Sequence, residues 1–308
     1  MTSPQRPARP SRECLTRRGP LRMVAWSLFV LVASACTSDV AEPVATPPTS
    51  VVSTWTTPTP TSTTTTVAKT TTAPPTTTTT PATTTTDGQR PLAGSIIVVD
   101  PGHNGRNWAH PDEINQRVDI GNGTKPCNTT GTSTNDGYQE ASFTWAVAQA
   151  LVILLRDAGA EVILTRPSND GWGPCVTERA ATGNDNHADA VVSIHADGGP
   201  ESGRGFHVIH PTNTPGLTDD IYEESLRLAR ALHHAYAATS MPVADYIGEK
   251  GVSERADLGG LNLSDVPAVL LEAGNMRNAT DAALLTDPEF QQTIAAAIVA
   301  ALTEFLSG

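Results

Sequence analysis

Between residues 95 and 308, short apolar runs rich in β-branched residues alternate with longer segments whose apolar residues recur at helical spacing. A run such as "SIIVVD", apolar without alternation, is typical of a strand buried on both faces of a sheet. The expected strands span 95–100, 160–166, 189–197, 203–211 and 267–274, and the expected helices span 139–159, 175–188, 218–240 and 288–306. This order predicts an α/β fold: a single domain with a mostly parallel, twisted sheet flanked by helices on both faces.

Several residues mark the expected ends of these helices and the loops between the elements. Gly159 follows the first long helix as a natural C-cap, and Thr218, with acidic residues after it, is a candidate N-cap. The stretch from 104 to 137 is rich in Gly, Asn and Thr and is expected to be a loop. No regular element is expected around 246–262.

The segment from 37 to 93 is dominated by threonine and proline and contains almost nothing apolar to bury. Such a composition cannot offset the entropy cost of folding, so the segment is expected to be a disordered stalk. The catalytic or binding function is therefore expected in residues 94–308, which have the length of one globular domain.

Residues 1–36 have the pattern of a signal peptide. Six arginines precede an uncharged run, "VAWSLFVLVASA", that is too short to span a bilayer comfortably. The run ends at Cys36, where a bacterial lipobox places its lipidated cysteine. Ordinary cleavage after Ala35 is an equal alternative, and "TRRGPLR" also resembles a twin-arginine signal. Export is expected in each case, with the protein either anchored in the membrane as a lipoprotein or secreted into the cell wall.

Charge and cysteine content fit an exported protein. Without residues 1–36, which hold six arginines and one glutamate, 14 basic and 31 acidic residues remain, a net charge of −17. This charge argues against binding nucleic acid. The expected domain contains only Cys127 and Cys175, which are expected to form a disulfide in an oxidising compartment. A metal-binding pair is the alternative, although neither cysteine has a neighbour at ligand spacing.

Two histidines and two glutamates lie where the expected strands end or the first helix begins. His103 follows the first strand, His195 ends the third, Glu272 ends the last, and Glu140 starts the first long helix. The carboxyl ends of parallel strands form the binding crevice of such a sheet. Three His and Glu ligands with an open position are typical of catalytic zinc, and a further carboxylate could serve as a base. Taken singly, each residue also fits a turn or a surface role.

Other polar residues near these positions are weaker candidates. His110 lies in the long loop and is a reserve ligand, whereas His207 and His210 could face solvent. Asp100 and Asp197 flank the two strand-end histidines and could orient them, or could simply cap turns.

The segments "VVDPGHNG", "QEASFTWAVAQALVILLRDAGAEVILTR", "VVSIHADG" and "VPAVLLEAGNMRN" resemble, in this order, the zinc-dependent N-acetylmuramoyl-L-alanine amidases of the Amidase_3 class, above all secreted mycobacterial and actinobacterial members. The resemblance covers residues 94–308. It implies that one Zn²⁺ is held by His103, Glu140 and His195, and that Glu272 is the catalytic acid and base. It also implies the reaction: a zinc-activated water cleaves the amide between N-acetylmuramic acid and the L-alanine of the peptidoglycan stem.

Three other functions fit the same residues. A zinc-dependent wall peptidase or deacetylase would use the same ligands, and a glycosidase could use Glu140 with Glu272. A non-catalytic envelope-binding protein would keep the crevice without turnover. The segment from 104 to 137 is longer than in the simplest family members, and a Cys127–Cys175 bond would pin it beside the cleft. We expect a monomer that acts on peptidoglycan or muropeptides and is held at the membrane if Cys36 is lipidated.

Overall fold

The computed structural model describes residues 90–308. The expected signal peptide at 1–36, the lipidation candidate Cys36 and the expected stalk up to residue 89 lie outside the described residues. Packing of the folded part begins before residue 94, because Leu92 is only 1% exposed and its N–H donates to the carbonyl of Ala158. Leu92, which the sequence prediction placed at the end of the stalk, therefore packs against the folded part.

The core of the fold is a six-stranded sheet in the order β4-β1-β5-β8-β6-β7. Strands β4, β1, β5 and β8 are parallel, whereas β6 is antiparallel to β8 and parallel to β7. The expected α/β class with a mostly parallel sheet is confirmed. Because β6 is reversed, it begins at the edge where β8 ends. The bounds are Ile96–Pro101 (β1), Glu161–Leu164 (β4), Ala190–Asp197 (β5), His207–Pro211 (β6), Val252–Arg255 (β7) and Ala268–Asn275 (β8).

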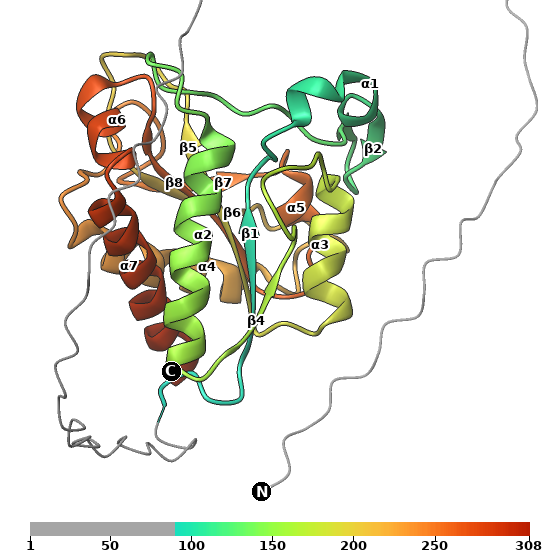
Figure 1. Ribbon diagram of the computed structural model, residues 1–308. Coiled ribbons are helices and arrows are strands. Elements are labelled where there is room, and N and C mark those ends of the chain that lie inside the picture. The colour runs from blue at the N-terminus through green and yellow to red at the C-terminus, as the bar shows by residue number, and fades with distance from the viewer. Residues whose placement is uncertain (1–89) are drawn as a thin grey trace, which may run out of the picture. The chain divides into compact units, whose positions relative to one another are not determined.

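Helices cover both faces of the sheet (Figure 1). Helices α2 (Glu140–Asp157), α4 (Tyr222–Ala237) and α7 (Pro288–Ser307) pack together and bury the larger core cluster. Helices α3 (Val176–Asp185) and α5 (Gly259–Asn262) pack against each other over the opposite face. Helix α7 is long and apolar enough to cross a membrane, but half of its most apolar window is buried, as in the core helix of a globular fold.

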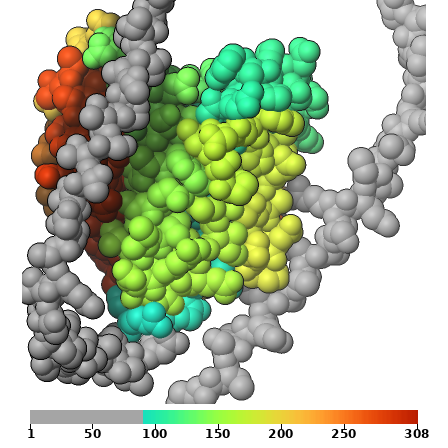
Figure 2. All heavy atoms as spheres, in the orientation of Figure 1, coloured from blue at the N-terminus to red at the C-terminus, as the bar shows by residue number. Residues whose placement is uncertain are grey.

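The segment from 104 to 137 is more regular than expected. It contains the short helices η2 (Asn107–Ala109) and α1 (Pro111–Ile114) and a hairpin of β2 (Arg117–Asp119) with β3 (Thr124–Pro126). Elements of three or four residues are too short to show a periodicity, so they read as loop. The expected disulfide is confirmed: Cys127 bonds Cys175, the residue before α3. In the space-filling view, the teal atoms of this segment sit on the yellow-green atoms around α3 (Figure 2).

Four further elements differ from the sequence prediction. Helix α4 begins at Tyr222, and Thr218 does not cap it, because its hydroxyl instead donates to the carbonyl of Thr212. Strand β7 and helix α5 occupy the stretch where no element was expected, and helix α6 (Ala279–Leu285) follows β8. By contrast Gly159, with φ of 99°, terminates α2 as expected.

Candidate metal centre

His103 is presented by a tight turn at the end of β1. Its backbone has φ of 58°, a left-handed conformation that a residue with a side chain adopts only when its surroundings impose it. Arg179 helps to impose this conformation, because its guanidinium donates hydrogen bonds to the carbonyls of Pro101 and His103. On the side-chain side, Nδ1 of His103 lies 3.0 Å from the carbonyl oxygen of Thr129, which leaves Nε2 free to face the crevice.

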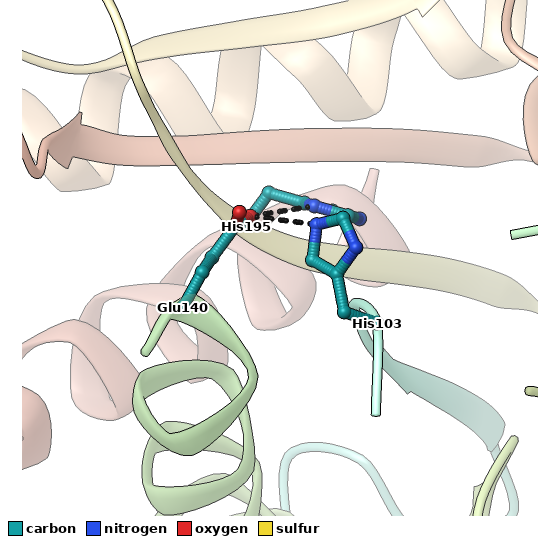
Figure 3. Close-up of side chains that lie close together, drawn as sticks. All are labelled: His103, Glu140 and His195. Carbon is teal, nitrogen blue, oxygen red and sulfur yellow. Dashed lines mark hydrogen bonds and ion pairs between the residues drawn. The ribbon is translucent and has the colours of Figure 1, made fainter. Parts of the chain in front are cut away.

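Glu140 is the first residue of α2, and its carboxylate contacts both imidazoles (Figure 3). Its Oε1 is 3.1 Å from Nε2 of His103 and 2.9 Å from Nδ1 of His195. Two backbone N–H groups fix the carboxylate: that of Thr132 donates to Oε2 at 2.9 Å, and that of Ala196 donates to Oε1 at 3.2 Å. Strand, helix and loop therefore all help to set its position.

The donor atoms of His103, Glu140 and His195 fit a small divalent cation. One ligand atom from each residue lies within 4.8 Å of the others. A tetrahedral Zn²⁺ with bonds of 2.0–2.1 Å holds its ligand atoms about 3.4 Å apart. The distances from Glu140 Oε1 to the two imidazoles, 3.1 and 2.9 Å, lie slightly below that value, and all three ligand atoms stay within 4.8 Å of one another. Two imidazoles and one carboxylate are also a donor set of catalytic zinc sites that keep an open position. These residues would hold Zn²⁺ with little rearrangement.

The electrostatics of the three residues agree with this arrangement. Burial alone would raise the pKa of Glu140, but the neighbouring imidazoles lower it well below its ordinary value. Burial likewise opposes protonation of His103, yet the carboxylate of Glu140 raises the pKa of that imidazole. The carboxylate is thus held as an anion in a buried setting, a state that favours a cation among these ligands.

Glu272 completes the group from the neighbouring strand. It is the register partner of His195 in the parallel pair β5–β8, so the two side chains leave the sheet on the same face. Burial, together with the nearby anions Glu140 and Asp197, raises the pKa of Glu272 well above its ordinary value. Within the described part of the chain, its Oε2 is buried and has no hydrogen-bond partner.

All four residues line one cleft of about 350 Å³ on the face of the sheet covered by α3 and α5. The structure thus brings together the four side chains that the sequence placed at the carboxyl edge. Lys125 and Arg255 also line the cleft, together with Asp257, with which both form ion pairs.

Several weaker candidates take other places. His110 stacks on Trp172 at 5.4 Å and is not part of the ligand cluster. His207 and His210, expected to face solvent, are only 1% and 3% exposed. His207 is the antiparallel partner of Glu272 in the β6–β8 pair, because β6 runs in the opposite direction to β8.

The two aspartates expected to orient the histidines have other partners. Asp100 accepts hydrogen bonds from Arg179, Thr165 and Ser193, and Asp197 accepts one from Tyr246. His103 is instead supported by the Thr129 carbonyl. Arg179 and Thr129 were missed, because nothing in the sequence marks a residue inside a polar helix or a threonine-rich loop as a support.

An α/β fold with a His–Glu–His cluster and an adjacent buried carboxylate is the architecture of a metal-dependent hydrolase. The profile of the family described as N-acetylmuramoyl-L-alanine amidase matches residues 97–304. An N-acetylmuramoyl-L-alanine amidase of Mycobacterium tuberculosis is 43% identical over 217 residues, which cover 70% of this chain and 88% of that protein. The chain therefore belongs to the N-acetylmuramoyl-L-alanine amidase family, and the expected enzyme class is confirmed.

Solved structures agree in fold. The amidase Ami1 of Mycobacterium smegmatis is 44% identical, with a TM-score of 0.66 over 70% of this chain and 98% of that one. Ami1 of Mycobacterium abscessus, in its apo form, is 42% identical with the same TM-score over 70% of this chain and 100% of that one. The amidase AmiC2 of Nostoc punctiforme, at 19% identity and a TM-score of 0.53 over 70% and 99%, shares the fold alone.

Proposed function

We propose that this protein hydrolyses the amide between the lactyl group of N-acetylmuramic acid and the L-alanine of the peptidoglycan stem, with one Zn²⁺ as cofactor. Family membership supports the reaction class, and the names of the mycobacterial relatives support the bond. The observation that carries the mechanism is the pairing of a compact His103–Glu140–His195 cluster with the buried, unpartnered carboxylate of Glu272.

In this proposal each side chain has a distinct task. His103, Glu140 and His195 hold Zn²⁺, which when bound supplies a Lewis acid for the carbonyl and makes a water easier to deprotonate. Glu272 takes the proton from the attacking water and delivers it to the nitrogen of the departing alanine. Burial raises the pKa of Glu272 above that of an ordinary carboxyl group, which makes it a better base toward the attacking water.

The alternatives fit the geometry less well. A glycosidase would need Glu140 to exchange protons, whereas both of its oxygens already accept backbone hydrogen bonds and one contacts two imidazoles. A wall peptidase or deacetylase would share the centre and would differ only in the bond cleaved. A non-catalytic binding protein would have no use for an unpartnered buried carboxylate.

Digestion of purified peptidoglycan tests the proposal. The full chain with Zn²⁺ should release stem peptides with a free L-alanine amino group and leave the glycan intact, and a chelator should stop the release. Glu272→Ala should retain zinc and lose hydrolysis, whereas His195→Ala should lose both. Loss of zinc in Glu272→Ala would mean that this carboxylate is a ligand, and new reducing ends or free acetate would identify another reaction.

We also propose the cellular setting that the leader implies. Residues 1–36 would direct export, residues 37–93 would tether the amidase domain 94–308 in the envelope, and Cys36 would carry lipid if the lipobox is used. Mass spectrometry of the mature N-terminus separates acylated Cys36 from cleavage after Ala35. A monomer is expected, and sedimentation of the zinc-loaded protein tests it.

A further inference from the structure

Trp108 is a large apolar side chain left in solvent beside the metal centre. It lies on η2, five residues after His103, and is 66% exposed. The other exposed tryptophan, Trp172, is 43% exposed and stacks on His110. Within residues 90–308 no ring stacks on Trp108 and its indole N–H has no hydrogen-bond partner. A single exposed apolar residue is ordinary, so the surroundings of the ring decide whether it could bind a ligand.

The ring forms one wall of a hollow of about 370 Å³, within the range of small-ligand sites. Thr130, Ser133 and Gln139 are among the residues that line this hollow, and no lining residue is charged. The side chains of Ser133 and Gln139 make no hydrogen bond to any described residue, so their polar atoms are available to a ligand. An uncharged hollow with one aromatic face and several hydroxyl and amide groups suits a neutral, polar, flat-sided molecule.

The hollow adjoins the metal centre through Gly131, one of its lining residues. A Cβ on Gly131 would come within 2.8 Å of both Oε2 of Glu140 and Cδ2 of His103, so this backbone touches two ligands. The next residue, Thr132, donates its N–H to Glu140 and also lines the cleft that contains Glu272. A molecule in the hollow is therefore separated from the reacting centre by one residue of backbone.

We propose that the hollow beside Trp108 binds a sugar of the glycan strand to which the scissile amide is attached. The C–H face of a pyranose stacks on an aromatic ring, and its hydroxyl and acetamide groups match Ser133 and Gln139. The inference rests on the proposed function, because an amide between sugar and peptide requires a sugar site next to the metal. Trp108 is thus a substrate-binding residue that would favour glycan-linked stems over free peptide.

The charged residues in the cleft that contains Glu272 indicate how the substrate is oriented across the metal centre. The cleft that contains Glu272 is lined by Lys125 and Arg255, each paired with Asp257, and a carboxylate of a stem peptide could take the place of that partner. The uncharged hollow beside Trp108 offers no cation to a carboxylate. With the scissile amide at the metal, the sugar would lie over Thr130–Thr132 and the peptide would run toward Lys125.

Binding in a hydrolytically inactive background tests the inference without turnover. Calorimetry on the full chain with Zn²⁺ and Glu272→Ala would compare a GlcNAc-MurNAc-peptide with the same peptide lacking sugar. Adding Trp108→Ala should weaken binding of the sugar-bearing ligand about tenfold and leave the free peptide unchanged. Trp108→Phe should retain most of the affinity, and Trp172→Ala is the matched control and should change neither. Because Trp108 is mostly exposed, its removal should not alter the melting temperature.

Two results would overturn the inference: unchanged affinity for the sugar-bearing ligand in Trp108→Ala, or an equal loss for both ligands. Hydrolysis of the same muropeptide by the parent protein is measured in a separate experiment, which tests the proposed function. Absence of cleavage there would refute the proposed function, whereas sugar-dependent binding through Trp108 would still be measurable.

Discussion

Gly102 lies against the imidazole of His195. A Cβ built on Gly102 would come within 2.3 Å of Cε1 and 2.6 Å of Nδ1 of that ring, closer than any real contact. The backbone at the end of β1 is thus the wall that the His195 ring packs on. The Pro-Gly-His turn has two consequences: it turns His103 toward the crevice, and it leaves room for the second histidine.

Replacing Gly102 by alanine should therefore displace His195 and weaken metal binding. We expect zinc affinity to fall by roughly 10- to 100-fold, as when a group that orients a ligand is altered. Titration of zinc into the chelator-stripped protein measures this. Gly123→Ala is the control, because nothing lies within 4 Å of a Cβ at that position. Equal zinc affinity in Gly102→Ala and parent would show that the ring can move without cost.

The charge of Asp197 should set the pH at which Glu272 works. Burial is the main cause that raises the pKa of Glu272, and the anions Glu140 and Asp197 add to it. Asp197→Asn removes one anion but keeps an oxygen that can accept the hydrogen bond from Tyr246. Glu272 then ionises more easily, so its basic form persists to lower pH.

We expect the acid limb of kcat/KM in Asp197→Asn to move to lower pH. Rates of muropeptide hydrolysis between pH 4 and pH 9 measure the limb. Asp185→Asn, on the exposed end of α3, should leave it in place. A shift to higher pH would mean that the limb reports another group.

Asp100 should contribute stability that is lost in acid. Burial opposes its ionisation, but Arg179 and hydrogen bonds from Ser193 and Thr165 lower the pKa of Asp100 from 3.8 to about 2. Because the pKa is lower in the folded state, the stabilisation is complete above the unfolded value near 4. It disappears as pH falls from there toward 2.

For the chelator-stripped protein, the free energy of unfolding of the parent should exceed that of Asp100→Asn at pH 6. The difference should shrink by about 2 kcal/mol on going to pH 2. Denaturant unfolding at several pH values measures this. Asp185→Asn again serves as the control, with a difference near zero throughout. A difference for Asp100→Asn that does not change with pH would assign its effect to packing alone.

The sequence predicted the four residues of the centre well because their placement follows from one rule. Buried parallel strands end at a common edge, so His103, His195 and Glu272 had to meet there, and Glu140 starts the helix that returns over the sheet. The position of His207 was not predicted, because it does not follow from that rule. The direction of β6 depends on tertiary pairing, and only its reversal puts His207 opposite Glu272.

The supports of the centre could not be predicted, since they act through backbone atoms. Arg179 holds the carbonyl of His103, and Thr129 and Thr132 contact the ligands through a carbonyl and an N–H. Such contacts leave no mark on residue type. The disulfide was predictable because only two cysteines remained in the domain, but the hairpin that precedes Cys127 was hidden by its short strands.

The Cys127–Cys175 bond should support the centre as well as the fold. The bond closes a segment with a sequence separation of 48 residues, and removing it should cost up to about 4 kcal/mol of unfolding free energy. The carbonyl of Thr129 on His103 lies two residues from Cys127. A released segment should therefore orient His103 less well, and zinc affinity should fall in the double Cys→Ser variant.

Denaturant unfolding and zinc titration of the Cys127→Ser, Cys175→Ser double variant separate the two effects. Phe305→Ala is a matched control: this side chain is 2% exposed near the end of α7, and its truncation costs roughly 3–5 kcal/mol without touching the ligand loop. We expect both proteins to be destabilised to a similar degree, and only the disulfide variant to bind zinc more weakly at a temperature where both are folded. If both retain the zinc affinity of the parent, hydrogen bonds alone hold Thr129 in place and the disulfide only stabilises the fold.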